Sequence, residues 1–348
     1  MQIERVNDNC TFAYVPDLEP LWGAINLLIG NEKSLVPCVE IYGSKQIAEW
    51  RQTYRFLFEC FEAVKKCGPA NMLDLLLDFP IEDFSAEKYR DALLRLSVED
   101  FIWRQLDLDY ADGANKEEIA KALTDDAALD RVFRWVSGDC ESFLTLSAFV
   151  RQSKRFITEF FSLAEELRTQ ALFDVLERQA GKIADMAQTV RDGAASSDLL
   201  VFSQQVMGKT FRNRGPYNDF VFSPSYLMPY RAARYFHRTG ERRRQHLFLS
   251  LWDSGRKQED TIRTLRAAAD GTRYQILTLL AKEGPLRGLD IARKICIAPS
   301  TVSHHMEQLR EGGLITEEQE KNAKYYGLDR QNAAAFLNEL KIDFMLEE

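Results

Sequence analysis

Apolar residues recur every three or four positions from Pro16 to about Asp192. This is the spacing that places side chains on one face of an α-helix. Leu94, Val98 and Phe101 form one such set, and turn-forming residues separate the sets from one another. The pattern predicts an all-α N-terminal domain, which we place at residues 1–195.

The pattern changes beyond the small, polar residues 193–197, whose composition suits a hinge. Residues 219–223 and 246–252 are short runs of apolar and aromatic side chains bounded by turn formers, as is typical of β-strands. The residues between them, 230–244, predict a basic helix. We expect residues 196–256 to form a small β-containing connector.

Three short helices are predicted near the C-terminus. Asp270 is a favourable N-cap residue for the first helix, and Gly284-Pro285 ends it. Residues 289–295 form the second helix. Pro299 suits the first position of a third helix, which we place at residues 299–311. This succession predicts a helix-turn-helix.

The third helix has one apolar and one polar face. Val302, Met306 and Leu309 share the apolar face. The opposite face carries Ser300, Ser303, His304 and Glu307. A helix that enters the major groove of DNA needs such a face, with short hydroxyls near its N-terminus and no bulky aliphatic residues. We therefore predict that this is the recognition helix.

Two strands are predicted after the third helix. Residues 314–316 and 324–328 are apolar and aromatic, and they flank a polar tip at residues 320–323. We interpret residues 314–328 as the β-wing of a winged helix. With a helix on either side, the winged helix-turn-helix domain is expected to span residues 257–348.

The residues that define this domain follow one another in a characteristic order. They are Leu265-Arg-Ala-Ala-Ala-Asp-Gly-Thr-Arg273, Ile276-Leu277, Pro285, Ser300-Thr-Val-Ser-His-His-Met306, Leu309-Arg-Glu-Gly-Gly-Leu-Ile315 and Tyr325-Tyr-Gly-Leu328. This order resembles the ArsR family of winged-helix repressors over about 65 of the 348 residues. The resemblance implies a homodimer, a recognition helix at residues 299–311 and a β-wing beside it. The whole chain also resembles, more weakly, long ArsR-type regulators in which an uncharacterised helical region precedes the winged helix.

The predicted function is sequence-specific binding of double-stranded DNA by a transcriptional regulator, and the resemblance implies a repressor. The expected DNA-binding residues are Ser300, Thr301, Ser303, His304, Lys321 and Lys324. The first four are expected to contact the major groove, whereas the two lysines of the wing would approach the flanking phosphates.

Several residues depart from the pattern of a DNA-binding winged helix. Glu307 lies where the family usually has a basic or neutral residue, and Glu317, Glu318 and Glu320 lie in the wing. Negative charges near a duplex oppose the attraction to its phosphates. Ala298 replaces the serine that usually caps the recognition helix. An alternative hypothesis is therefore a winged-helix interaction or scaffold protein that no longer binds DNA.

Charge is distributed unevenly along the chain, whose formal net charge is −8. Residues 1–208 carry 22 basic and 35 acidic side chains, whereas residues 209–244 carry 9 basic and 2 acidic ones. The arginines of the basic segment are Arg231, Arg234, Arg238, Arg242, Arg243 and Arg244. Three interpretations stay open for them: a solvated face, contact with the DNA backbone, or salt bridges to the acidic N-terminal domain.

Composition argues against several other classes of protein. Hydrophobic residues make up 45% of the chain, and no apolar run approaches the roughly 20 residues of a membrane span. The N-terminus lacks the apolar core of a signal peptide, so a cytoplasmic protein is expected.

The cysteines and histidines show no pattern of a metal or catalytic site. The six cysteines form no CxxC motif, and none of the four histidines lies within five residues of a cysteine. Cys296 stands alone before the recognition helix and predicts a small buried thiol. Without a catalytic triad or a glycine-rich cofactor loop, we expect neither an enzyme nor a bound cofactor or metal.

Two further expectations concern partners. The helices that flank the winged helix, at residues 257–269 and 331–346, carry more apolar residues than a domain of this size hides, and Phe336, Leu340 and Phe344 would be natural anchors of a dimer interface. The N-terminal domain contains Trp22, Trp50, Trp103 and Trp135. It would either enclose a pocket for a small-molecule effector or form a solid core that dimerises or docks a partner.

Overall fold

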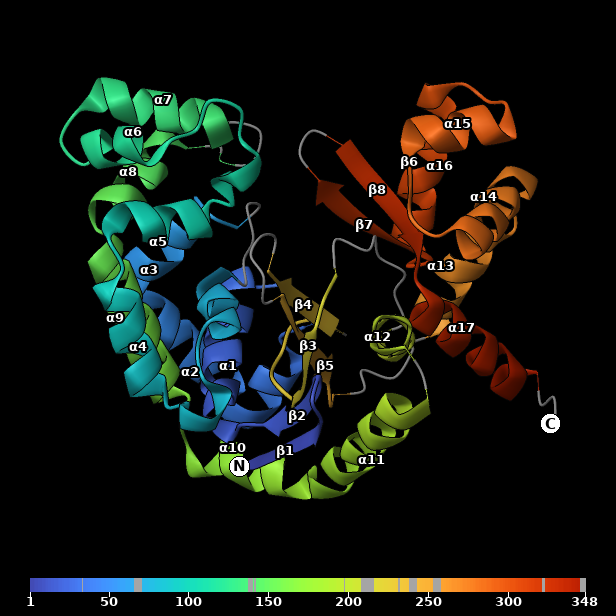
Figure 1. The fold of residues 1–348 in the computed structure, drawn as a ribbon, viewed down its shortest axis with the longest axis horizontal. Helices are drawn as coiled ribbons and strands as arrows, with labels where there is room; N and C mark the ends of the chain where they lie inside the picture. The colour runs from blue at the N-terminus through green and yellow to red at the C-terminus, as the bar shows by residue number, and fades with distance from the viewer. Residues whose placement is uncertain are drawn as a thin grey trace. The chain divides into compact units, whose positions relative to one another are not determined.

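The computed structural model describes most of the chain. The residues left undescribed are 33, 66–70, 137–139, 141, 197, 208–215, 231, 238–242, 253–257, 321–322 and 345–348. The chain forms two compact units (Figure 1). The first comprises Met1–Asp192 and Asn218–Trp252, and the second comprises Gly193–Tyr217 and Asp253–Glu348.

Helices make up most of the first unit. They are η1 (Pro16–Leu18), α1 (Glu19–Ile29), α2 (Val36–Thr53), α3 (Arg55–Phe61), η2 (Asn71–Leu77), η3 (Ile81–Asp83), α4 (Ala86–Arg95), α5 (Val98–Gln105), η4 (Leu108–Tyr110), α6 (Lys116–Ala122), α7 (Asp126–Val136), α8 (Phe143–Arg151), α9 (Ser153–Glu166), α10 (Gln170–Arg178) and α11 (Ala180–Ser196), which ends in the second unit. Side chains cap several of them: Ser85, Ser97, Asn115, Ser142 and Thr169 each accept a backbone N–H from three residues further on. The prediction of a mainly α protein is confirmed.

A five-stranded sheet also belongs to the first unit, so the detail that the N-terminal domain is all-α was wrong. Its strands are β1 (Gln2–Asn7), β2 (Cys10–Tyr14), β3 (Asp219–Ser225), β4 (Ala232–Phe236) and β5 (Arg244–Ser250), in the order β1-β2-β3-β5-β4. β2 pairs with β3 and β3 with β5 in parallel, whereas the pairs β1–β2 and β4–β5 are antiparallel. The apolar pattern does not reveal β1, because most of its side chains are polar and none of its residues is buried.

The segment predicted as a basic helix, residues 230–244, contains strand β4 instead. Ala232 and Tyr235 are buried, and the strand is in register with β5 so that Arg234 lies opposite Leu247. The guanidinium of Arg234 stacks over the ring of Phe236, 4.4 Å from its centre. Pairing with the buried β5 outweighs the helical preference of the alanines and arginines, since helix propensity is a weak local term.

Strands β3, β4 and β5 are part of the first unit, whereas the sequence-based division placed them in a separate connector at residues 196–256. Arg244 contributes to this arrangement, because its Nε pairs with Asp219 at 2.8 Å and its Nη1 donates to the Leu77 carbonyl at 3.2 Å. The basic segment thus supplies at least one internal salt bridge, and Arg231, Arg238 and Arg242 lie outside the described residues.

A buried carboxylate fixes the end of β3 to α1. Glu19, at the first position of α1, accepts hydrogen bonds from the Ser225 hydroxyl at 3.0 Å, the Tyr226 N–H at 2.9 Å and the Leu227 N–H at 2.9 Å. Burial raises the pKa of Glu19 to about 7, and these hydrogen bonds offset only part of the effect. One turn further along α1, the ring of Trp22 packs edge-on against Phe248 of β5, with ring centres 5.1 Å apart.

The second unit contains a three-stranded sheet among helices. Its described elements are α12 (Leu199–Met207), α13 (Gln258–Ala268), α14 (Gly271–Glu283), β6 (Leu286–Arg287), α15 (Gly288–Ile295), α16 (Pro299–Glu311), β7 (Ile315–Glu320), β8 (Ala323–Leu328) and α17 (Arg330–Asp343). The strand order is β6-β8-β7. Among the described residues of the whole chain, no helix is long and apolar enough to cross a membrane.

Candidate nucleic-acid interface

Helices α14, α15 and α16 form the helix-turn-helix (Figure 1). They share one apolar core with β7. Ile276 and Leu280 of α14, Ile291 of α15 and Val302 of α16 are among its fully buried members. Each of these side chains buries most of its apolar surface on folding. This burial contributes on the order of 1.5–3 kcal/mol per side chain to the free energy of unfolding. The core therefore holds α16 firmly against the rest of the unit and leaves its opposite side outward.

The ends of these helices are set by local chemistry. The Asp270 side chain accepts the Arg273 N–H at 2.9 Å and caps α14, as predicted. Gly284 ends α14 with φ 81°, a backbone conformation that glycine adopts without strain. Cys296 takes the left-handed conformation (φ 57°) at the end of α15 and is exposed, so the prediction of a buried thiol was wrong. Pro299 begins α16 after Ala298, which provides no side-chain cap.

The outward face of α16 brings together four of the predicted site residues. Ser300, Thr301, Ser303 and His304 are all exposed, whereas Val302, Met306 and Leu309 are buried to 2% exposure or less. The Ser303 hydroxyl donates to the Pro299 carbonyl at 3.1 Å. The result is a surface of short polar side chains on the first two turns of a helix.

His305, the neighbour of His304, lies on the inner side of α16. Its Nδ1 is buried, makes no hydrogen bond to a described residue and lies 3.9 Å from the carboxylate of Asp270. Because Asp270 is also the cap of α14, His305 lies between α16 and the start of α14. His305 is thus half-buried, whereas His304 lies on the outer surface.

The wing carries the remaining predicted residues. Strands β7 and β8 pair from Ile315 with Leu328 to Glu320 with Ala323, so the hairpin is longer than the predicted strands. Lys324 lies on β8, and its Nζ pairs with the Glu317 carboxylate of β7 at 2.7 Å. Lys321, the other predicted wing residue, lies outside the described residues.

Acidic residues neutralise basic ones on both elements. On α16, the Glu307 carboxylate pairs with Arg310 one turn later, and this hydrogen bond lowers the pKa of Glu307. On the wing, the hydrogen bond with Glu317 raises the pKa of Lys324. Arg310 lies close enough to Glu317 to interact with it electrostatically. The four side chains therefore form one charge-balanced cluster, which we call the α16–wing cluster.

Arg310 is not among the residues predicted from the sequence to bind DNA. Glu307 and Arg310 are three residues apart on a predicted helix, and this spacing favours an ion pair. The pairing of the two could therefore have been predicted. The contact between their pair and the wing could not, because it depends on how β7 and β8 fold back beside α16.

Comparison with known proteins identifies the same region. The family model of bacterial regulatory proteins of the arsR family matches residues 270–317. A cadmium resistance transcriptional regulatory protein CadC homolog from Staphylococcus aureus is 31% identical over 88 residues, which are 24% of this chain and 73% of that protein.

A solved structure is also similar in sequence. It is the homodimeric winged helix-turn-helix DNA-binding domain of a possible ArsR-family transcriptional regulator from Mycobacterium bovis, at 32% identity over 26% of this chain and 83% of that one. The TM-score is 0.22, so the assignment rests on the sequence matches. On these matches, the chain belongs to the ArsR family and is a winged-helix transcriptional regulator.

Proposed function

We propose that this regulator is a repressor that binds a specific duplex by inserting α16 into the major groove. The observation that carries the proposal is the outward face of α16, where Ser300, Thr301, Ser303 and His304 are exposed and no large aliphatic side chain projects. Ser303 and His304 would reach base edges. Ser300 and Thr301, beside the free N–H groups of the helix N-terminus, would also contact phosphate oxygens.

The wing supplies the second contact in this proposal. Lys324, and Lys321 at the tip, would approach the flanking backbone and fix the orientation of the duplex. We assign DNA binding to residues 257–348 and reception of the signal to the first unit.

The chain would act as a homodimer, because Ile262 and Leu265 of α13, Leu337 of α17 and the predicted anchor Phe344 remain between 42% and 64% exposed in the single chain. Phe336, also predicted as an anchor, is buried within the single chain instead. The Mycobacterium bovis relative named above is described as homodimeric.

Fluorescence anisotropy with a duplex from upstream of the protein's own gene tests this function. We expect binding that a scrambled duplex does not reproduce, with two chains per duplex. The logarithm of the affinity should fall linearly with the logarithm of the salt concentration. The slope of this line should be about −0.9 for each phosphate that the protein neutralises. Equal affinity for the scrambled duplex would show that the binding is not sequence-specific. No binding at low salt would favour a winged helix that contacts protein instead of DNA. The charge balance of the α16–wing cluster is the observation on which that second function stands.

Replacing Glu317 with glutamine is expected to strengthen DNA binding about 3- to 5-fold. The substitution removes the carboxylate that pairs with Lys324 at 2.7 Å, so the ammonium becomes available to a phosphate. The slope of the logarithm of affinity against the logarithm of salt concentration should steepen by about one. Glu318→Gln is the matched control, because successive side chains of a strand point to opposite faces. If the two variants gained equally, the gain would come from overall charge and not from Lys324.

A further inference from the structure

The recognition helix α16 ends in two glycines that lie beside α13, the helix before the helix-turn-helix. The last residue of α16 is Glu311, and Gly312 and Gly313 follow it. Gly313 takes a left-handed conformation (φ 68°), and its N–H donates back to the Arg310 carbonyl at 2.9 Å. This is a common way for a helix to end. The Gly312 carbonyl is one of the last of the helix, for which α16 itself supplies no N–H.

Close contact between α13 and the end of α16 explains the glycine at position 312. Its backbone is in the right-handed region (φ −73°, ψ −5°), which does not require glycine. A Cβ atom at this position, however, would lie 2.4 Å from the Cβ of Ala267 in α13. Ordinary contact between carbon atoms is roughly 3.5–4.0 Å. Glycine is therefore needed at position 312 because the two helices touch there.

Thr264 reaches the end of α16 across this contact. It lies one turn before Ala267 on the same side of α13, and its hydroxyl donates to the Gly312 carbonyl at 2.7 Å. Thr264 is 1% exposed, so the hydrogen bond is shielded from water. The Asp260 carbonyl of α13 is the other acceptor of this hydroxyl, at 3.0 Å. The Gly312 carbonyl is the nearer of the two, and it belongs to a different helix.

Thr261 offers a comparison within the same helix. It lies three residues before Thr264 on the same side of α13 and is 4% exposed. Its hydroxyl is buried and makes no hydrogen bond to a described residue. Burial on this side of α13 therefore does not by itself supply a partner. Thr264 differs from Thr261 in having an acceptor at the end of α16.

A directional contact at this end affects the whole recognition helix. Hydrophobic contact is non-directional, whereas a hydrogen bond weakens steeply when its donor and acceptor are misaligned. Ser300 lies 12 residues before Gly312, which corresponds to about 18 Å along a helix. A tilt of roughly 10° about the Gly312 end would therefore move Ser300 by about 3 Å. A movement of this size would break a hydrogen bond to a base edge.

We propose that Thr264 is a positioning residue for the recognition helix. Its hydrogen bond holds the end of α16 to α13 and thereby sets the orientation in which Ser303 and His304 meet the duplex. The inference rests on the proposed function, namely the insertion of α16 into the major groove. The hydrogen bond itself can be examined without DNA. A failure of this inference is therefore distinguishable from a failure of DNA binding.

Thr264→Val tests the proposal by fluorescence anisotropy, because valine is close to threonine in shape and lacks the hydroxyl. We expect the affinity for the target duplex to fall about 10-fold, which corresponds to the loss of one hydrogen bond. The affinity for a scrambled duplex depends on phosphate contacts and should change by less than about 2-fold. Thr264→Ser keeps the hydroxyl and should bind both duplexes as the wild type does. Thr261→Val is the matched control and should also bind as the wild type does.

Hydrogen exchange of the full-length protein without DNA examines the contact directly. The backbone amides of Gly312, Gly313 and Leu314 should exchange about 10-fold faster in Thr264→Val than in the wild type. Their exchange should stay unchanged in Thr261→Val. If the wild type did not bind the target duplex, the proposed function would fail. The exchange rates would still decide whether Thr264 holds the end of α16.

Two further variants change the same contact and leave Thr264 intact. Gly312→Ala places a Cβ atom against that of Ala267 and should separate the end of α16 from α13. We expect the same selective loss of affinity for the target duplex. Ala267→Gly removes the opposing Cβ atom, so the double variant should recover most of the affinity. This pair also tests the proposal if Thr264→Val does not fold.

Three results would overturn the proposal. The first is a target affinity in Thr264→Val equal to that of the wild type. The second is an equal loss in Thr264→Val and Thr261→Val, which would assign the effect to the packing of α13. The third is a proportional loss on the target and scrambled duplexes, which would indicate weakened folding instead of a misoriented helix.

Discussion

Replacing Ser303 with glutamate is expected to weaken binding to the target duplex roughly 100-fold or more. Ser303 lies on the exposed face of α16, where its hydroxyl donates to the Pro299 carbonyl. Glutamate there introduces a negative charge and a longer side chain at the position proposed to face base edges and phosphates. Glutamate is a better helix former than serine, so the helix itself should persist.

The measurement is anisotropy on the target duplex, accompanied by far-ultraviolet circular dichroism to confirm the fold. Gln275→Glu is the matched control, because it adds the same charge at an exposed position of α14 outside the proposed contact face. Its affinity should change by less than about 3-fold. Unchanged affinity in Ser303→Glu would contradict the assignment of α16 to the groove.

Replacing Glu19 with alanine is expected to destabilise the first unit by about 3–5 kcal/mol. The carboxylate is 1% exposed and accepts hydrogen bonds from the Ser225 hydroxyl and from the backbone N–H groups of Tyr226 and Leu227. Without it, two buried N–H groups lose their acceptor, at about 1–3 kcal/mol each. Glu19→Gln should be less harmful, because one acceptor oxygen remains.

The destabilisation should depend on pH. The pKa of Glu19 is raised by burial to about 7, above its ordinary value of 4.5, so the folded state holds this proton more tightly than the unfolded state does. The tighter binding of this proton in the folded state adds to the free energy of unfolding. The added free energy is fully present below pH 4.5 and is lost as the pH rises through about 7. The difference between wild type and Glu19→Gln should therefore be larger at pH 5 than at pH 8.

Tryptophan fluorescence during guanidinium unfolding measures this effect in the first unit alone. All five tryptophans, Trp22, Trp50, Trp103, Trp135 and Trp252, lie in that unit. Glu177→Ala, at an exposed position of α10, is the control and should change stability by less than about 0.5 kcal/mol. A difference between wild type and Glu19→Gln that does not vary with pH would show that Glu19 is charged in both states.

The winged helix could be predicted from the sequence because its signals are local. Asp270 caps α14, Gly284 ends it and Pro299 begins α16, each within one turn of the boundary that it sets. The alternation of Val302, Met306 and Leu309 with polar residues also identified the inner and outer faces of α16 correctly. The bounds predicted for the recognition helix, 299–311, are those of α16.

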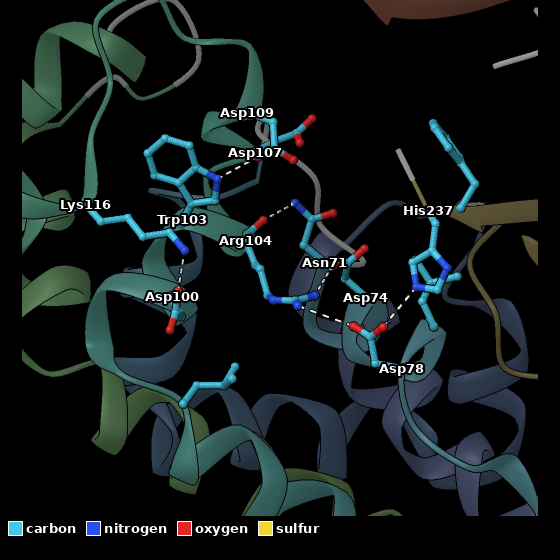
Figure 2. A pocket seen from close by; sticks show the side chains of 13 residues that line it. Asn71, Asp74, Asp78, Asp100, Trp103, Arg104, Asp107, Asp109, Lys116 and His237 are labelled. Atoms are coloured by element: carbon cyan, nitrogen blue, oxygen red, sulfur yellow. Dashed lines mark hydrogen bonds and ion pairs between the residues drawn. The ribbon is translucent and has the colours of Figure 1, made fainter. Parts of the chain in front are cut away.

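The missed features depend on contacts between distant residues. β1 has no apolar stripe, and it is a strand because it pairs with β2, which pairs in turn with β3 more than 200 residues later. Likewise, β4 is a strand because β5 lies beside it. A pocket in the N-terminal domain was one of two predicted alternatives, but its lining, shown in Figure 2, could not be predicted for the same reason, because Asp78 and Arg104 lie near His237 only when distant segments pack together. Periodicity reports how one segment is buried, and it carries no information about which segments become neighbours.

The parallel pairing of β2 with β3 also sets an order of events during synthesis. Residues 10–12 leave the ribosome long before their partners, residues 220–222, have been translated. Until β3 has been made, the hairpin of β1 and β2 has no partner for the free edge of β2. Pairing between strands so far apart in the sequence is slow, and an unpaired edge can associate with other chains. The contacts within the winged helix, by contrast, all lie within the last stretch of chain to be made. A nascent chain that stops short of residue 218 therefore has neither β3, β4 and β5 of the five-stranded sheet nor any part of the winged helix, and premature termination leaves β2 without its parallel partner.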